Sequence, residues 1–307
     1  MKYYLSIDIG GTNLKYGLLD RAGHLIEHDK VPTPTSGLDD FMQVLTSIID
    51  TQISRVRGIA ISVPGKIDVS QGVVYFGGSL PFLDKVPLGK QLSEKYHVPV
   101  GLENDGKAAA MAELWLGNLQ QTPNSAAVVL GTGVGGGIIL NGQLLYGTHF
   151  QAGEFSFMLN DFKNSNFIDA AVGGNTSAVG MIRNIGTELS LKDPADGIAV
   201  FQQIKAGNPI AVTKFKHFCN YVAKMILNVQ SVVDLQRYVI GGGISAQPLV
   251  VKTINAEYNQ MLAATPIIQD SLTKPEIIAA KFGNDANLYG ALYSLLQQVN
   301  GERQAVI

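Results

Sequence analysis

Two adjacent polar residues, Asn104 and Asp105, lie between a short strand pattern and an alanine-rich helix pattern. Asn and Asp are ordinary residues at helix N-termini, and most such pairs serve only as caps. A carboxylate at this junction could also accept the proton of an attacking hydroxyl, as the base does in phosphoryl transfer. Asn104 would then hydrogen-bond neighbouring hydroxyls of a polyol. The pair taken alone leaves both interpretations open.

A second carboxylate, Asp8, ends the first strand pattern and directly precedes a glycine-rich turn. The turn has the sequence Ile9-Gly10-Gly11-Thr12-Asn13. A carboxylate in this place could orient a hydrated Mg²⁺ ion. It could equally well cap the turn, and this feature alone does not separate the two interpretations.

Three glycine-rich loops each follow a predicted strand. Backbone amides can surround a phosphate only where side chains are absent, and threonine hydroxyls add donors. A single loop of this kind is most simply a tight turn, but three at strand ends favour phosphate binding. The loops are Gly10-Gly11-Thr12, Gly131-Thr132-Gly133-Val134-Gly135-Gly136-Gly137 and Gly241-Gly242-Gly243.

The second loop contains Gly131-x-Gly133-x-x-Gly136, which matches the dinucleotide fingerprint. That motif needs a helix after the loop and an acidic residue about 20 positions further on. Residues 138–142 instead predict a strand that enters a hairpin, and Glu154 falls in a loop pattern. A dehydrogenase is therefore rejected. A Walker loop is absent from the sequence as well.

A further polar segment, Gln151-Ala152-Gly153-Glu154, follows the hairpin. A single Glu in a loop is usually solvated, but beside a sugar it could accept two hydroxyl protons. His149 could contact the same sugar, although a lone surface histidine is the simpler interpretation.

The elements that must position these residues follow from hydrophobic periodicity and turn signals. Strands are predicted over 3–9, 14–19, 25–31, 56–63, 98–102, 126–130, 136–140, 143–146, 238–240 and 277–280. Helices are predicted over 37–53, from Asn104 to about 116, over 209–233, from about 247, and over 286–298. The polar stretch 117–125 is the best candidate for a domain boundary. The second half thus opens as the first does, with strand, glycine-rich turn and strand.

Composition narrows the class of protein. The chain has 307 residues with 23 Lys and Arg against 25 Asp and Glu, so its charge predicts neither nucleic-acid nor membrane partners. No signal peptide or apolar span is recognised, which favours the cytoplasm. The single cysteine, Cys219, excludes disulfides within the chain and zinc sites built from several of its cysteines. Its place on the stripe of 209–233 predicts a buried apolar thiol.

Six ordered motifs together resemble the ROK family of bacterial sugar kinases, repressors and open reading frames of unknown role. The resemblance spans essentially the whole chain, down to Asn284-Asp285-Ala286-Asn287-Leu288-Tyr289-Gly290-Ala291. The motifs are Asp8-Ile9-Gly10-Gly11-Thr12, Ile61-Ser62-Val63-Pro64-Gly65, Glu103-Asn104-Asp105, Leu130–Gly137, Ala152-Gly153-Glu154 and Ile240–Gly243.

The resemblance implies an α/β fold of two actin-like, ribonuclease-H-like domains with mixed sheets flanked by helices and a cleft between them. The domains would span 1–117 and 118–285, with a last helix at about 286–307 packed back on the first. ROK repressors carry a DNA-binding domain before the first loop, whereas this sequence starts at that strand. A homodimer is implied by the resemblance alone.

The resemblance also implies ATP as a cofactor, with Mg²⁺ held by Asp8 through water. Asp105 matches the catalytic base, and the sugar ligands would be Asn104, Glu154, Gly65 and His149. ATP would contact Asp8, Gly10, Gly11, Thr12, Asn13, Lys15, Gly131, Thr132, Gly133, Gly241, Gly242 and Gly243, the last three at the adenosine end.

The sequence departs from the family where many ROK kinases bind zinc. Phe157 stands where those kinases have a zinc-binding histidine, and Phe167–Met181 has neither the cysteines nor the glutamate of the family segment. No zinc is therefore expected, and part of the usual sugar contact is missing. The expected function is ATP-dependent phosphorylation of a 6-hydroxyl on a hexose, a glucoside or an N-acetylated amino sugar. The alternative is a sugar-binding regulator without catalysis.

Overall fold

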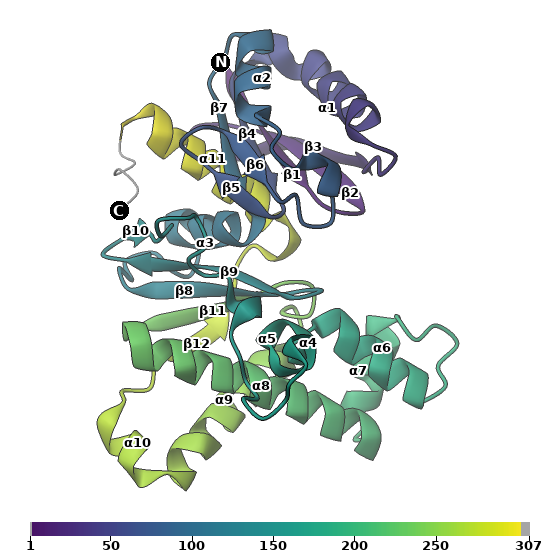
Figure 1. Cartoon of the computed structure of the whole chain (residues 1–307), viewed down its shortest axis with the longest axis vertical. Helices are drawn as coiled ribbons and strands as arrows, with labels where there is room; N and C mark the ends of the chain where they lie inside the picture. The colour runs from purple at the N-terminus through teal and green to yellow at the C-terminus, as the bar shows by residue number, and fades with distance from the viewer. Residues whose placement is uncertain (1, 302–307) are drawn as a thin grey trace. The chain divides into compact units, whose positions relative to one another are not determined.

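The structure is a computed structural model and describes residues 2–301. The chain divides into two compact units. Unit 1 comprises Met1–Gln121, Gly137–Gly153 and Asn284–Ile307, and unit 2 comprises Thr122–Gly136 and Glu154–Gly283. Unit 1 is thus assembled from three separate segments of the chain. Figure 1 shows the elements of each unit in sequence colours.

Unit 1 contains a mixed five-stranded sheet with the strand order β3-β2-β1-β4-β7. β1, β4 and β7 are parallel, whereas β2 pairs antiparallel with both β1 and β3. Parallel strands end at one edge, so the residues that follow β1 and β7 lie along the same border. The strands are β1 (Tyr3–Ile9), β2 (Asn13–Leu19), β3 (Leu25–Pro32), β4 (Val56–Val63) and β7 (Val100–Asn104).

The alternation of β1 divides its side chains between two buried faces. Leu5, Ile7 and Ile9 pack with residues of α1 (Leu38–Gln52) and α2 (Leu88–Tyr96). Tyr4 faces the other side, where it packs with the apolar side chains of α11 (Ala286–Val299). Ser6 lies on that second side too, and its hydroxyl donates to the carbonyl of Leu288 at 2.6 Å.

Helix α11 also packs against α3 (Asp105–Leu116), and Gly290 makes this close contact possible. A Cβ at Gly290 would lie 1.6 Å from the carbonyl oxygen of Ala108, so any larger residue would push the helices apart. The sequence pattern predicts the last helix over 286–298, and the resemblance extends it to about 307; the helix ends at Val299, and residues 302–307 lie outside the described residues. Unit 1 also has a short ribbon of β5 (Lys66–Asp68) and β6 (Val73–Tyr75).

The second sheet has the strand order β10-β9-β8-β11-β12. β11 pairs in parallel with β8 and β12, and β9 forms the predicted hairpin with β10 across Asn141-Gly142. β10 is shorter than the strand predicted over 143–146. The bounds are β8 (Ser125–Leu130), β9 (Val134–Leu140), β10 (Gln143–Leu144), β11 (Arg237–Gly241) and β12 (Glu276–Ala279).

The longest helix of unit 2 is α8 (Pro209–Val233), with the bounds that its apolar stripe predicts. Asn208 caps it by accepting from the amides of Ile210 and Ala211, and Pro209 fits the first helical position. Its buried face includes Phe215, Cys219 and Val222. The other helices are α4 (Phe167–Ala170), α5 (Val172–Asn175), α6 (Ala178–Glu188), α7 (Gly197–Lys205), α9 (Pro248–Ala264) and α10 (Pro266–Ser271). No helix in the described part of the chain is both long and apolar enough to cross a bilayer.

Candidate active site

Asp8 lies near the carboxyl end of β1 and is 6% exposed. Its Oδ1 accepts a hydrogen bond from Asn287 Nδ2 at 2.9 Å, and its Oδ2 lies 3.5 Å from Lys15 Nζ. Lys15 also donates to the carbonyl of Asn284 at 2.9 Å. Asp8 is therefore oriented by Asn287 at the start of α11 and by Lys15 on β2. Asp8 and Lys15, two predicted cofactor residues, thus lie next to each other.

The loop after β1 is a tight turn closed by its own backbone. The amide of Gly10 donates to the carbonyl of Asn13 at 3.0 Å. Thr33 fixes the loop from outside, since its amide donates to the carbonyl of Thr12 and its hydroxyl to that of Gly10 at 2.6 Å. Gly11 and Thr12 stay exposed to solvent. The first loop is thus a preorganised turn whose tip is exposed.

Asn104 and Asp105 lie where β7 passes into α3. Asn104 is 6% exposed and caps α3, because its Oδ1 accepts from the amide of Lys107 at 3.0 Å. Its Nδ2 donates to the carbonyl of Gly65 at 2.8 Å and to Asp105 Oδ1 at 3.0 Å. Asp105 Oδ1 also accepts from the amide of Gly106 at 2.8 Å. Gly65 from one predicted motif and Asn104 and Asp105 from another therefore form one hydrogen-bonded group.

Asp8 and Asp105 lie at the same edge of the first sheet. Asp8 pairs with Ser62 on β4, and Asn104 pairs with the next residue of β4, Val63. One strand therefore separates β1 from β7 at this level, which places their backbones about 10 Å apart. That separation is suited to a phosphate with its metal ion near Asp8 and an acceptor hydroxyl near Asp105.

In unit 2 the structure brings together the second and third loops. β8 and β11 are parallel neighbours, with Val129 opposite Gly241, so Gly131 and Gly243 follow the same edge. The amide of Gly131 donates to the carbonyl of Gly133 at 3.0 Å. Gly242 has φ +92°, and a Cβ there would lie 2.1 Å from the carbonyl oxygen of Leu130. Only glycine fits that position without strain.

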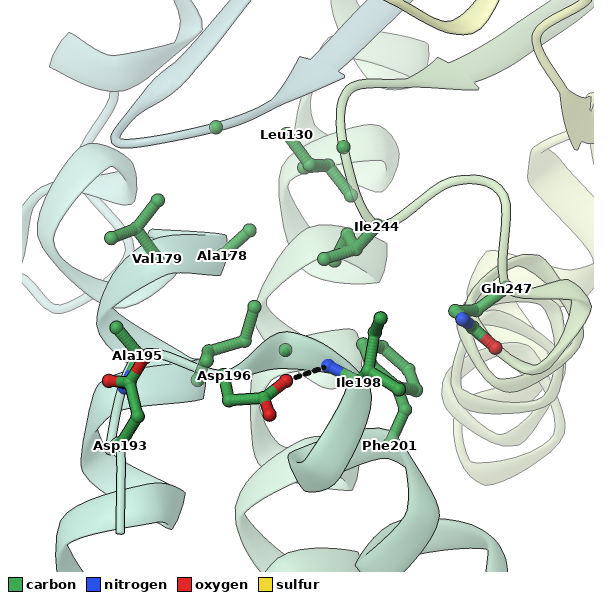
Figure 2. A pocket seen from close by; sticks show the side chains of 14 residues that line it. Leu130, Ala178, Val179, Asp193, Ala195, Asp196, Ile198, Phe201, Ile244 and Gln247 are labelled. Atoms are coloured by element: carbon green, nitrogen blue, oxygen red, sulfur yellow. Dashed lines mark hydrogen bonds between the residues drawn. The ribbon is translucent and has the colours of Figure 1, made fainter. Parts of the chain in front are cut away.

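A cavity of about 550 Å³ opens beside these two loops. Gly131 and Gly243 form part of its wall, and Figure 2 shows the side chains around it. One part is apolar, and two carboxylates lie at another. The wall includes Leu130, Ala178, Val179, Ile182, Asp193, Asp196, Ile198, Phe201, Ile244 and Gln247. A volume of this size with few polar groups is typical of small-ligand sites.

The polar groups of this cavity have fixed orientations. Asp196 caps α7, since its Oδ1 accepts from the amides of Ile198 and Ala199. Gln247 Oε1 accepts from Lys205 Nζ at 2.9 Å, so Nε2 is the Gln247 group that can donate to a ligand. These cavity residues carried no prediction from the sequence, because no local motif marks them.

Glu154 belongs to unit 2 and directly precedes the short helical turn Phe155–Phe157. Ser156, two residues later, accepts from the amide of Val134 at 2.8 Å and donates back to its carbonyl at 3.1 Å. The Glu154 segment is therefore attached to the second glycine-rich loop. Phe157 is 63% exposed. His149 belongs to unit 1 and is exposed.

Among residues 2–301, no group of three or more His, Cys, Asp or Glu side chains could hold a metal ion. Cys219 is fully buried in α8. Its burial raises the pKa of the thiol, and the nearby carboxylate of Glu257 adds to the rise. The thiol is thus an apolar core group, as its place on the helical stripe predicts.

Residues 4–298 match the ROK family, and the chain belongs to that family. It is 31% identical to a β-glucoside kinase of Klebsiella pneumoniae, over 95% of each chain. It is 29% identical to a glucokinase of Halalkalibacterium halodurans, over 97% of this chain and 96% of that one. Among solved structures, a ROK family protein from Streptococcus pneumoniae in complex with sucrose has a TM-score of 0.87. Its sequence identity is 30%, covering 97% of this chain and 99% of that chain. The fold is accordingly the actin-like fold that the motifs predict.

Proposed function

We propose that the chain transfers the γ-phosphoryl group of Mg-ATP to the 6-hydroxyl of glucose or of a β-glucoside. By class the chain is an ATP-dependent sugar kinase, since its named relatives at about this identity are sugar kinases. The specific reaction rests on one observation above all. Asp105 is a half-buried carboxylate at a strand–helix junction, oriented by Asn104 and by the amide of Gly106.

In this reaction Asp105 accepts the proton of the attacking 6-hydroxyl. Asn104 and Gly106 both donate to Oδ1, so the orientation of the carboxylate is fixed before the sugar arrives. Asn104 also orders the carbonyl of Gly65, which is the acceptor that we assign to a sugar hydroxyl. Glu154 and His149 are assigned to other sugar hydroxyls.

The nucleotide is assigned to unit 2. The adenine ring would lie against Ile198 and Ile244 in the cavity, with ribose hydroxyls near Asp193 or Asp196. The glycine loops at 131–133 and 241–243 would then place their amides around the phosphates. Asp8 would hold Mg²⁺ through water, with Asn287 on its Oδ1 and Lys15 at 3.5 Å from its Oδ2. Lys15, Gly10, Gly11, Thr12 and Asn13 are the residues of unit 1 that we assign to phosphate binding.

The preference for glucose or a β-glucoside has two supports. One is the likeness to a β-glucoside kinase and to a protein solved with sucrose. The other is Phe157, whose exposed ring replaces a polar group and offers an apolar face to a second sugar ring or an aglycone. N-acetylated amino sugars are the competing substrates to be tested.

The test is release of ADP from Mg-ATP by the whole chain across a panel of sugars, for wild type and for Asp105→Asn. Wild type should respond to glucose or a β-glucoside. The variant should lose about 100- to 10,000-fold in kcat, the range for a general base, with sugar affinity nearly intact. Asp20→Asn is the matched control, because Asp20 caps a surface turn by accepting from the amides of Ala22 and His24. A near-normal rate for Asp105→Asn would refute the assignment. Sugar binding in a thermal-shift assay without ADP release from any sugar would show a regulator instead.

A further inference from the structure

Glu103 precedes the Asn104–Asp105 pair and is a buried carboxylate, only 1% exposed. Its Oε1 accepts from the amide of Asn104 at 3.0 Å. Its Oε2 accepts from the hydroxyl of Tyr146 at 2.6 Å and from that of Ser294 at 2.7 Å. Burying a carboxylate is costly unless donors satisfy it, and an apolar residue would serve a plain core better. The three donors indicate that Glu103 has a task in holding geometry.

The backbone and the ring of Tyr146 make a second set of contacts. Its carbonyl accepts from the amide of Ala152 at 3.1 Å, and its ring meets that of Phe150 edge-on, with centroids 6.2 Å apart. The amide of Phe150 donates to the carbonyl of Gly147 at 3.2 Å, which folds the intervening residues into a compact loop. We call residues 147–153 the acceptor loop, because they contain His149 and lead along the chain to Glu154. Tyr146 therefore joins the acceptor loop to the end of β7.

We propose that Tyr146 and Glu103 are positioning residues that align the base Asp105 with the acceptor loop. The orientation of Asp105 then depends on the conformation of the acceptor loop. The proposal rests on the kinase function proposed above. The route is continuous and lies within unit 1. The Tyr146 hydroxyl holds the Glu103 carboxylate, that carboxylate holds the amide of Asn104, and the Asn104 side chain holds Asp105. Ser294 of α11 donates to the same carboxylate at 2.7 Å.

The first variant is Tyr146→Phe in the whole chain, with kcat and KM measured for the sugar and for ATP. The change removes one hydroxyl and keeps the ring against Phe150. We expect kcat with sugar to fall about tenfold, because a charge-assisted hydrogen bond that sets alignment is lost. The KM for ATP should stay within about twofold, since the cavity of unit 2 is untouched.

The matched control is Tyr96→Phe. Tyr96 also donates its hydroxyl to a carboxylate of unit 1, Asp50, at 2.8 Å, but it lies at the end of α2. Its kinetic constants should equal those of wild type. A purely structural role for Tyr146 would lower the melting temperature in both variants and leave kcat per folded molecule unchanged. That result, or a Tyr146→Phe enzyme within about twofold of wild type, would overturn the proposal.

A second pair, Glu103→Gln and Glu103→Leu, tests the carboxylate itself. The amide of Gln can accept from Asn104 and donate to the two hydroxyls, which are free to rotate. Leu can do neither. Glu103→Gln should therefore retain at least about tenfold more kcat than Glu103→Leu, and equal rates would contradict the proposal.

Asp105→Asn separates this inference from the function on which it rests. An active Asp105→Asn enzyme would refute the proposed base and, with it, the alignment. An inactive Asp105→Asn enzyme beside a normal Tyr146→Phe enzyme would refute the alignment alone.

Discussion

The edge of the first sheet and the cavity of unit 2 differ in the groups that form them. At the sheet edge, buried side chains carry the site, and Asp8, Glu103 and Asn104 are held by side-chain hydrogen bonds. In the cavity, two glycine-rich turns and apolar side chains form the wall, and its carboxylates serve helix and turn amides.

The difference shows how each region fails. A site made of oriented carboxylates should be sensitive to isosteric changes of charge and tolerant of small changes of volume. A site made of close backbone turns should be sensitive to one added methyl group and tolerant of changes in charge nearby. Substitutions matched in size can therefore separate the two regions.

The largest effect after loss of the base should come from Asp8→Asn. The amide can still accept from Asn287, so the fold should be kept, while the negative charge that attracts Mg²⁺ is lost. We expect kcat to fall about 100- to 1,000-fold, as when one electrostatic group of a site is removed. Steady-state kinetics over a Mg²⁺ titration measure this, with Asp20→Asn as control. A variant with wild-type kcat at saturating Mg²⁺ would show that Asp8 only anchors Asn287 and Lys15.

A smaller effect on rate, but a clear effect on stability, should follow from Gly242→Ala. The new Cβ would meet the Leu130 carbonyl at 2.1 Å in a backbone with φ +92°. We expect a loss of about 1–3 kcal/mol in the free energy of unfolding and a raised KM for ATP. Gly243→Ala is the control for denaturant unfolding, because no atom lies within 4 Å of its added Cβ. Equal unfolding free energies for the two variants would contradict the strain at Gly242.

The smallest effect concerns Cys219, which belongs to neither region. Its raised pKa keeps the thiol neutral, and a neutral thiol is a poor nucleophile. A disulfide reagent at pH 8 should leave native protein unmodified, with unchanged kcat, and should label one thiol per chain after unfolding. Above pH 9, the ordinary pKa of the thiol, the unfolded chain loses this proton while the folded chain keeps it. The free energy of unfolding therefore falls as pH rises above 9. Rapid labelling of the native protein would show that α8 opens.

The fold followed from the sequence where an element is long and periodic. α8 matches its predicted bounds because an apolar stripe, an Asn cap and an N-terminal Pro all agree. The ribbon of β5 and β6 has strands of three residues each, too short for any period to be read. α7 likewise has nine residues and carried no prediction.

The sequence predicted candidate site residues where they belong to continuous motifs. Asn104 and Asp105 are consecutive, and the glycine loops are continuous motifs. Glu103 contacts Tyr146 and Ser294, which are 43 and 191 residues away along the chain. No local signal joins those three residues, because only the packing of β7, α11 and the segment after β10 brings them together.

Helix α11 places a constraint on the order in which the protein can mature. Ribosomes make it after the whole of unit 2, yet it supplies Asn287 to Asp8 and Ser294 to Glu103. Until α11 has emerged, the face of β1, β4 and β7 that it covers is left without its partner. A nascent chain can therefore complete unit 2 first, and the hydrogen bonds to Asp8 and Glu103 form only when α11 docks.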